Sequence, residues 1–412
     1  MPPDEERSRL PRPAPALHAA ASTAGAAAIS VSAEIMADGD WSAMTAAALP
    51  VPAPAPAARP LGPGGRAVYT LSQALRIAWF FGQYRVAALR AAPALRPEEI
   101  PPGMPSQGEL FARIVALLRR DRANIEAGVY RMPHDWLPRP AAAARMARRF
   151  LADLEEVTRR RRAGSGQEVL AEARATGAAR AYPRYYLQNF HFQTGGWLSD
   201  ESAALYDYQV ETLFYGTADA MRRQGLVPIA EHIRAAAGAG RRVAELRLLD
   251  VASGTGRFLG SIKDNWPRLP ATALDLSPNY LRHARARLAR RSWLSFVNAA
   301  AEAMPVADAS IDLVTCIYLF HELPAKVRRQ VAREIGRVLR PGGRLVLIDS
   351  IQLGDDPPLD PLLELFPRAY HEPYFQDYVR TDLDALFAPA GLRPARHEQA
   401  LFSKVSVYDK GA

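Results

Sequence analysis

The chain has 412 residues, 49% of them hydrophobic and 23% charged. This composition is typical of a soluble globular protein of two to three domains and excludes a collagen, a coiled coil and a largely disordered chain. The net charge of +9 is the difference between 52 basic and 43 acidic residues, and 48 of the basic residues are arginine. We attribute this charge to codon bias toward Ala, Arg and Pro, and we expect no nucleic-acid partner from it.

A single cysteine, Cys316, excludes an internal disulfide framework. No run of about 18 apolar residues is free of Pro and charge, so the sequence predicts no transmembrane segment. The acidic residues at the start of the chain argue against a secretory or transit peptide. We therefore expect a reducing, cytoplasmic location.

Residues 1–66 are dominated by Ala and Pro and have no sustained hydrophobic period, which predicts a disordered tail. Residues 67–180 are expected to form a small all-α domain. Its second helix should begin with a capping box, Ser106 with Glu109, and a third should follow Pro140. The basic run 159–162 ends that third helix, where we expect it to remain solvated.

Residues 181–225 form an aromatic-rich connecting segment. Ten of the 35 aromatic residues lie between Tyr182 and Tyr215, and the part up to residue 200 reads as an ordered, irregular loop. Two interpretations stay open: a domain interface built by aromatic packing, or the wall of a pocket for an apolar or aromatic substrate. Under the second, Tyr186 and Trp197 are candidate substrate contacts.

Residues 226–412 alternate short apolar runs with helical stretches, which predicts βαβ units and a parallel sheet covered by helices on both faces. The two last runs lie too close together for an intervening helix and should form an antiparallel edge hairpin. The fold class is thus α/β: a Rossmann-like, doubly wound, mostly parallel sheet of seven strands. The expected strands are 246–252, 271–277, 294–300, 311–320, 343–351, 393–398 and 402–408.

A glycine-rich turn, DVASGTG (250–256), follows the first of these strands and opens a helix. Ligands of open α/β folds bind at this end of the sheet, and glycines allow close approach to the backbone. Asp275 ends the second strand, where a carboxylate can accept both ribose hydroxyls. A nicotinamide-binding pattern fails, because Leu259 stands where its third glycine belongs.

The ordered motifs DVASGTG, LDLS, AEAMP, SIDLV, LFHELP and RVLRPGGRLVLID, within about residues 226–410, resemble the class I S-adenosylmethionine-dependent methyltransferases. Among these, the methyltransferases of ubiquinone and menaquinone biosynthesis are the most similar. The resemblance implies S-adenosylmethionine as cofactor. It also implies that the cofactor contacts are Asp250, Ala252, Gly254, Gly256, Asp275, Leu276, Ala301, Glu302, Cys316 and Ile317.

In this assignment Asp250, Gly254 and Gly256 line the methionine end, Asp275 holds the ribose and Leu276 packs on the adenine. Two positions depart from the family pattern. Ala252 stands where many members carry Gly, and Ala300 stands where an Asp often accepts from the adenine amino group. Asn298 or a backbone carbonyl is the expected replacement for that contact.

Two histidines are candidate general bases. His321 follows the fourth strand, beside Tyr318, and His371 lies in an insertion between the fifth and sixth strands that similar enzymes place over the acceptor. The alternatives are loop packing for His321 and a pair with Glu372 that pins the insertion for His371. Further candidate substrate contacts are Tyr318, Asp349 and Tyr374, although Asp349 is as readily a helix cap.

The predicted function is therefore methyl transfer to a small, apolar or aromatic acceptor by O- or C-methylation. No zinc-like Cys/His spacing is present, so no metal ligands are predicted. Two alternatives remain: a scaffold or assembly protein that keeps the cofactor fold without turnover, and methylation of a macromolecule. The sequence does not indicate the oligomeric state.

Overall fold

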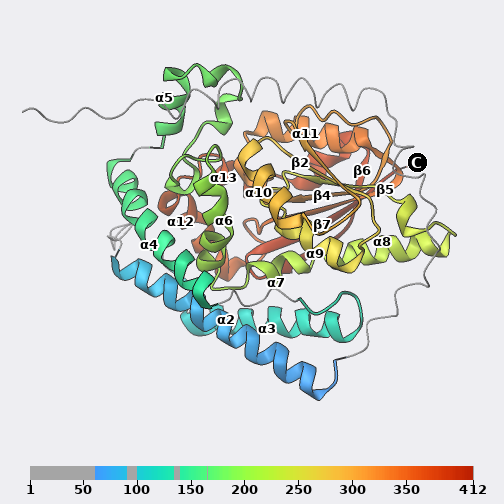
Figure 1. Ribbon diagram of the computed structural model, residues 1–412, viewed down its shortest axis with the longest axis horizontal. Coiled ribbons are helices and arrows are strands. Elements are labelled where there is room, and N and C mark those ends of the chain that lie inside the picture. Colours follow the sequence, from blue (N-terminus) through green and yellow to red (C-terminus); the bar gives the residue numbers. More distant parts are fainter. Residues whose placement is uncertain (1–60, 91–99, 134–139, 165, 412) are drawn as a thin grey trace, which may run out of the picture.

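The computed structural model describes residues 61–90, 100–133, 140–164 and 166–411. The tail predicted over residues 1–66 therefore lies almost entirely outside the described residues. The C-terminal part contains one seven-stranded sheet in the order β3-β2-β1-β4-β5-β7-β6 (Figure 1). The strands are β1 (Leu248–Val251), β2 (Ala271–Asp275), β3 (Leu294–Asn298), β4 (Ile311–Ile317), β5 (Leu339–Ser350), β6 (Leu392–Ala400) and β7 (Ser403–Lys410).

Strands β1 to β5 pair in parallel, whereas β7 pairs antiparallel with both β5 and β6. The predicted fold class, a doubly wound mostly parallel sheet with an antiparallel edge hairpin, is confirmed. Strand β5 begins at Leu339, earlier than the predicted residue 343, and its start is irregular because the pairing with β4 shifts between Ile311 and Leu313.

Of the described helices, α2 to α8 precede the first strand, and α9 to α14 lie between the strands. They are α2 (Pro63–Arg90), α3 (Gln107–Glu126), α4 (Pro140–Ala163), α5 (Glu168–Ala175), α6 (Asp200–Leu213), α7 (Ala218–Arg223), α8 (Leu226–Gly238), α9 (Arg257–Asn265), α10 (Pro278–Leu288), α11 (Ala325–Val338), α12 (Asp360–Ala369), α13 (Phe375–Tyr378) and α14 (Leu383–Phe387). Helix α3 begins at the predicted capping box, with Ser106 as N-cap and Glu109 bonded back to it.

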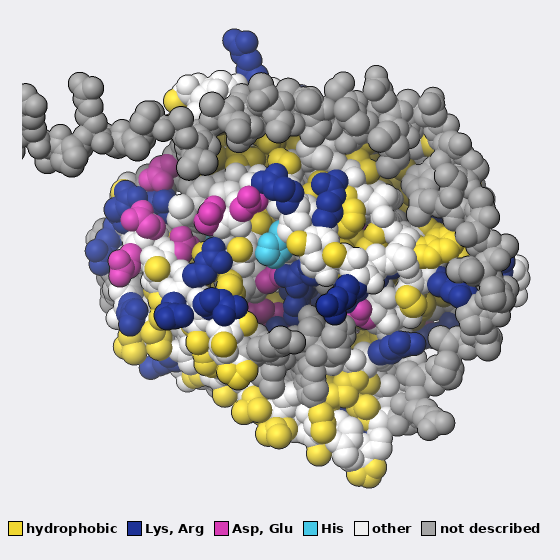
Figure 2. All heavy atoms as spheres, in the orientation of Figure 1, with side chains coloured by type: hydrophobic (Ala, Val, Ile, Leu, Met, Phe, Trp, Pro, Cys, Tyr) yellow, Lys and Arg dark blue, Asp and Glu magenta, His cyan; other side chains and the backbone are white. Residues whose placement is uncertain are grey.

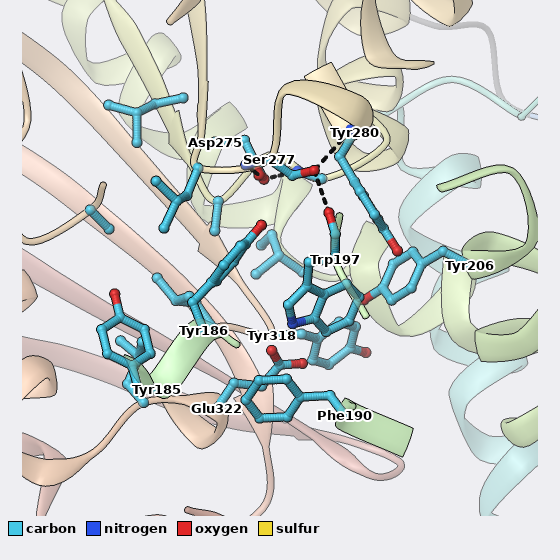
Figure 3. Close-up of a pocket in the computed structure, with 18 of the residues that line it drawn as sticks. Tyr185, Tyr186, Phe190, Trp197, Tyr206, Asp275, Ser277, Tyr280, Tyr318 and Glu322 are labelled. Carbon is cyan, nitrogen blue, oxygen red and sulfur yellow. Dashed lines mark hydrogen bonds between the residues drawn. The ribbon is translucent and has the colours of Figure 1, made fainter. Parts of the chain in front are cut away.

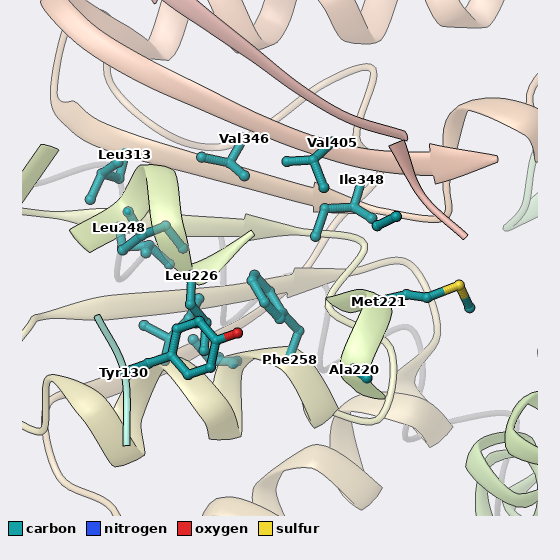
Figure 4. Packing of buried hydrophobic residues seen from close by; sticks show 14 of the residues in the cluster. Tyr130, Ala220, Met221, Leu226, Leu248, Phe258, Leu313, Val346, Ile348 and Val405 are labelled. Atoms are coloured by element: carbon teal, nitrogen blue, oxygen red, sulfur yellow. The ribbon is translucent and has the colours of Figure 1, made fainter. Parts of the chain in front are cut away.

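Helices bury both faces of the sheet. Successive strand residues point to opposite faces, so they belong to different core clusters. Leu248 belongs to a core cluster that also contains residues of α7, α8 and α9, such as Phe258 (Figure 4). The next residue, Leu249, belongs to a second cluster with residues of α11, α13 and α14, such as Tyr378. This double burial explains why the strands read as continuous apolar runs.

The N-terminal helices α2 and α3 share the first of these clusters, through Tyr69 and Leu117. They are also joined to α7 by a buried polar group: the Asp121 carboxylate accepts from the hydroxyls of Tyr69 and Tyr130 and from both ends of the Arg223 guanidinium, at 2.6–2.9 Å. The helical part therefore packs directly on the helices that cover the sheet.

Helix α4 ends in the basic run, but the expectation that this run stays solvated is wrong for Arg160. Its side chain is buried and donates to Glu168, to the Phe192 carbonyl and to Thr194. A guanidinium offers several donors in a fixed plane, so it satisfies the backbone of an irregular segment well. Arg160 thus fixes the aromatic-rich segment to α4.

On the face shown in Figure 2, basic side chains are scattered among acidic ones and form no single stripe. Apolar side chains follow its lower edge, where α2 and α3 lie in Figure 1. Exposed examples are Leu71, Leu75, Leu89 and Phe111. Within the described ranges, no helix is both long enough and apolar enough to cross a membrane.

Candidate active site

A pocket lies at the carboxyl ends of β1, β2 and β4. The turn after β1 takes left-handed backbone conformations at Ala252 (φ 55°), Gly254 (φ 55°) and Gly256 (φ 70°), which favour glycine. Gly254 has open space where a side chain would stand. Gly256 instead packs against α10, because an added Cβ would lie 3.0 Å from Leu288. The turn therefore presents bare backbone to the pocket on one side only.

Asp275 holds this turn to the end of β2. Its two carboxylate oxygens accept from the backbone N–H groups of Gly254 and Ser277, each at 2.8 Å. Burial raises the pKa of Asp275 to about 6, although these two hydrogen bonds act in the opposite direction. At neutral pH the group is an ionised acceptor at the pocket wall, which is what two ribose hydroxyls require.

The structure brings six of the ten predicted cofactor residues to this pocket: Ala252, Gly254, Asp275, Leu276, Ala301 and Ile317. The other four do not line it. Asp250 is buried and accepts from Thr315, its neighbour on β4, at 2.6 Å. Cys316 is fully buried in the sheet, Gly256 packs on α10, and Glu302 accepts from the Tyr185 hydroxyl at 2.7 Å.

Asn298, the expected replacement for the adenine-binding Asp, is not among the residues that line this pocket. Its side-chain amide donates to the backbone carbonyls of Asp275 and Leu276, each at 2.9 Å. Both of its N–H groups are thereby used within the protein. Asn298 fixes the path of the chain after β2, and the backbone around residues 299–301 is what remains to meet an adenine.

The aromatic-rich segment covers this pocket (Figure 3). Tyr186, Phe190 and Trp197 line it, and the Trp197 carbonyl accepts from the Ser277 hydroxyl at 2.5 Å. Trp197 also packs edge-on against Tyr206 and Tyr280. Tyr186 and Trp197, predicted as substrate contacts, therefore stand over the cofactor side. Tyr374 packs 6.5 Å from Phe190, ring to ring, on the outside of this group.

A second, larger cavity of about 490 Å³ adjoins the first. Three residues, Tyr206, Tyr318 and Glu322, line both. The remaining wall is mostly apolar and comes from α2, α6, α12 and α13, together with loops next to the sheet; it includes Tyr84, Val210, Leu213, Leu362, Phe366, Phe375 and Phe402. A side chamber of about 300 Å³ between α4 and α6 shares seven of its lining residues. Of the predicted substrate contacts, Tyr318 alone stands on the wall of this cavity.

His321 lines the larger cavity, and its Nδ1 lies 2.5 Å from the Asp349 carboxylate. Burial by itself lowers the pKa of His321, but the neighbouring carboxylates of Asp349, Glu372 and Glu322 outweigh it and raise the pKa to about 9. At neutral pH the ring carries a proton, which is the wrong state for a group that begins by accepting one. Asp349 itself is buried and also accepts from the Phe320 and Ser350 amides, so it orients the ring.

His371 lies outside both cavities. Its ring nitrogen is 3.3 Å from the Gln188 side chain, and the ring packs beside Gly166. It does not pair with Glu372, as one alternative for this insertion supposed. Glu372 instead points inward, with an oxygen 3.1 Å from the Nε2 of His191. The structure therefore separates the two candidate bases and brings only His321 to the cavity.

Several wall residues were not predicted. Ser277, directly before Pro278, caps α10 and contacts Asp275; the Ser-Pro step is a helix-start signal that could have singled it out. His191 is a second wall residue that the sequence did not single out. It has a left-handed backbone (φ 55°) inside a short helical turn, and no sequence pattern indicates where such a side chain points. Burial lowers its pKa to about 3, so the imidazole is neutral.

These features fit the predicted cofactor: a bare turn after β1, an ionised carboxylate after β2, and an apolar bed at Leu276 and Ile317. Residues 248–343 match a protein family described as a methyltransferase domain. The C-terminal part of this chain is a class I S-adenosylmethionine-dependent methyltransferase domain. S-adenosylmethionine is its methyl donor.

The methyltransferase domain has curated relatives. Over 175 residues it is 34% identical to the ubiquinone/menaquinone biosynthesis C-methyltransferase UbiE of Syntrophotalea carbinolica, covering 42% of this chain and 66% of that protein. It is 38% identical over 117 residues to a demethylmenaquinone methyltransferase of Deinococcus radiodurans, covering 28% and 48%. The chain thus spans only about half to two thirds of these two relatives.

Among solved structures, human N-acetylserotonin methyltransferase in complex with S-adenosylmethionine is similar over 66% of this chain and 70% of that one, with 15% identity and a TM-score of 0.41. The methyltransferase domain is also 37% identical over 99 residues to a malonyl-acyl-carrier-protein O-methyltransferase of Methylococcus capsulatus, covering 24% of this chain and 35% of that protein.

Proposed function

We propose that this protein transfers the methyl group of S-adenosylmethionine to a small, largely apolar or aromatic acceptor, by O- or C-methylation. The observation that carries the proposal is the wall of Tyr206, Tyr318 and Glu322, which the cofactor pocket and the 490 Å³ cavity have in common. A methyl donor in the pocket and an acceptor in the cavity would therefore both contact these three side chains.

Methyl transfer requires the protein chiefly to position the acceptor against the donor. When bound, S-adenosylmethionine would supply an already activated methyl group; its transfer to an O–H or C–H acceptor would yield the methylated product, S-adenosylhomocysteine and one proton released to solvent. Holding the two reactants in line and excluding water provides most of the rate. The aromatic cover over the cofactor side and the apolar wall of the cavity serve both purposes.

The cavity also selects the acceptor. Its wall has few polar groups, chiefly His191, His321, Glu322 and Ser350, and these lie among aromatic and aliphatic side chains. Such a site favours a molecule with an apolar body and one polar end. The relatives named for quinone methylation support this class, and His321, held by Asp349, is the residue that we assign to contact the polar end.

The test has two steps. Calorimetric titration with S-adenosylhomocysteine should show binding, and cell extract incubated with isotopically labelled S-adenosylmethionine should give a labelled apolar product by mass spectrometry. Leu213→Trp, which places an indole ring where the larger cavity meets its side chamber, should strongly reduce product while leaving S-adenosylhomocysteine binding unchanged. Leu71→Trp on the exposed face of α2 is the control. Binding without any labelled product would overturn the proposal.

A further inference from the structure

Beside the acceptor cavity lies a group of ionisable side chains, one buried and two partly buried, that methyl transfer alone does not require. His191, Glu322 and Glu372 approach one another there, with one donor atom of each lying within 4.8 Å of the others. They come from three separate segments: the aromatic-rich segment, the loop after β4 and the loop between α12 and α13. Only the folded chain brings them together.

Glu372 is the decisive member. Its side chain is completely buried, and apart from the His191 imidazole at 3.1 Å neither carboxylate oxygen has a hydrogen-bond partner. A buried carboxylate without compensation is costly, by several kcal/mol in typical cases. Glu322 brings a second carboxylate oxygen within 4.8 Å of Glu372, and no Lys or Arg is among the described residues that line the cavity beside them.

We propose that His191, Glu322 and Glu372 bind one divalent transition-metal ion beside the acceptor cavity. One imidazole nitrogen and two carboxylate oxygens form a donor set that suits Mn²⁺, Fe²⁺ or Zn²⁺ better than the all-oxygen preference of Ca²⁺. Atoms bound to one such ion at about 2.1 Å lie about 3 to 4 Å apart. Small side-chain rotations bring the three donors from their present spacing to this one.

The place of the site suggests its use. Glu322 lines both the cofactor pocket and the acceptor cavity, and His191 lines the cavity. Three protein ligands leave coordination positions for water or for an oxygen of the acceptor. An acceptor oxygen bound there would lie beside the wall where the methyl group is transferred. This use rests on the proposed function, whereas the binding of the ion itself does not.

The first experiment uses the full-length protein after removal of metals with a chelator. Mn²⁺ is titrated in and the free ion is followed by electron paramagnetic resonance; Co²⁺ is added separately to record its visible spectrum. We expect one ion per chain and Co²⁺ bands that indicate nitrogen ligation. These readings need no variant, so they stand even if a substitution prevents folding. A wild-type protein that binds no ion would overturn the proposal.

The second experiment compares variants. Glu372→Gln and His191→Ala should each weaken Mn²⁺ binding at least about tenfold. His371→Ala, adjacent to Glu372 but turned toward Gln188, should bind Mn²⁺ as the wild type does. Glu372→Gln with unchanged Mn²⁺ affinity, or a loss of thermal stability that is the same with and without Mn²⁺, would mean that His191 and Glu372 only fasten two loops together.

S-adenosylhomocysteine binding is measured in the same samples. In the wild type, absence of Mn²⁺ binding with this affinity present would refute the metal site alone, whereas absence of both would refute the proposed function as well. A small amine that occupies the cavity in place of Mn²⁺, while the wild type takes up no metal, would show that the carboxylates serve a cationic acceptor and would also overturn the proposal.

Discussion

The two sides of the cleft are built in different ways. Beneath its aromatic cover, the cofactor side is formed by the backbone turns that follow β1, β2 and β4, and its carboxylate Asp275 is fixed by two backbone amides. The acceptor side is formed mainly by side chains that come from α2, α6, α12 and α13, together with Phe402 in the turn between β6 and β7. The first therefore depends on local chain geometry, and the second depends on how distant segments pack.

The largest expected effect is a loss of stability in the helical part, which should impair the acceptor side and leave the cofactor side intact. Asp121→Ala removes the carboxylate that Arg223, Tyr69 and Tyr130 share, and should lower the free energy of unfolding by about 3 to 5 kcal/mol. Urea unfolding measures it. In the folded fraction, S-adenosylhomocysteine should still bind, while turnover should fall because α2 contributes Tyr84 to the acceptor cavity.

The control for this prediction is Asp264→Ala on α9. Its ion pair with Arg291 is partly exposed to solvent, so the loss should stay below about 1 kcal/mol. Equal losses for both variants would show that the helical part does not depend on the buried carboxylate.

The next effect is confined to the cofactor side. Asp275→Ala leaves the amides of Gly254 and Ser277 without their acceptor and removes the partner of the ribose. We expect S-adenosylhomocysteine to bind about 100-fold more weakly, equivalent to about 3 kcal/mol. Calorimetric titration measures this, with the largely exposed Asp308→Ala as control. Unchanged affinity would remove Asp275 from the site.

The acceptor side is tested by the two histidines. His321→Ala should lower kcat by about tenfold to 100-fold, since the ring lines the cavity and is held by Asp349. His371→Ala should leave kcat unchanged, because this ring contacts Gln188 outside both cavities. Both are measured at saturating S-adenosylmethionine. The reverse result would place the acceptor on the outer side of the insertion.

A pH profile examines the cofactor side without a mutation. Burial raises the pKa of Asp275 to about 6, and ribose hydroxyls bind to the ionised form. Affinity for S-adenosylhomocysteine should therefore be constant above pH 6 and should fall by about tenfold per unit as the pH drops below it. In Asp275→Asn the profile should be flat; a matching fall in that variant would point to a different group.

The same contrast explains what the sequence could predict. The strands, their mostly parallel pairing and the turn around Gly254 follow from apolar runs, glycines and short connections, all of which are local signals. Pocket membership was predicted less well, because alternate strand residues face opposite ways. Asp250 belongs to the motif, yet its carboxylate is used by Thr315 across the β1–β4 pair. The position of Glu372 depended on tertiary packing that no local pattern encodes.

The smallest effect concerns Ala252, which the pocket-side turn holds at φ 55°. This conformation costs an alanine about 1 kcal/mol, while glycine adopts it freely but gives the unfolded chain more entropy. Ala252→Gly should therefore stabilise the fold by about 0.5 kcal/mol. Ala309→Gly, at φ 48° in an exposed loop away from the pocket, should have a similar effect and serves as the matched control.

The two variants should differ in cofactor binding. Only residue 252 lines the cofactor pocket, so only Ala252→Gly should alter the affinity for S-adenosylhomocysteine, by a few-fold at most. If Ala252→Gly destabilises the protein while Ala309→Gly does not, the alanine methyl group contributes packing at the pocket wall. The cofactor side would then also depend on side chains, and the contrast with the acceptor side would be weaker than the backbone geometry indicates.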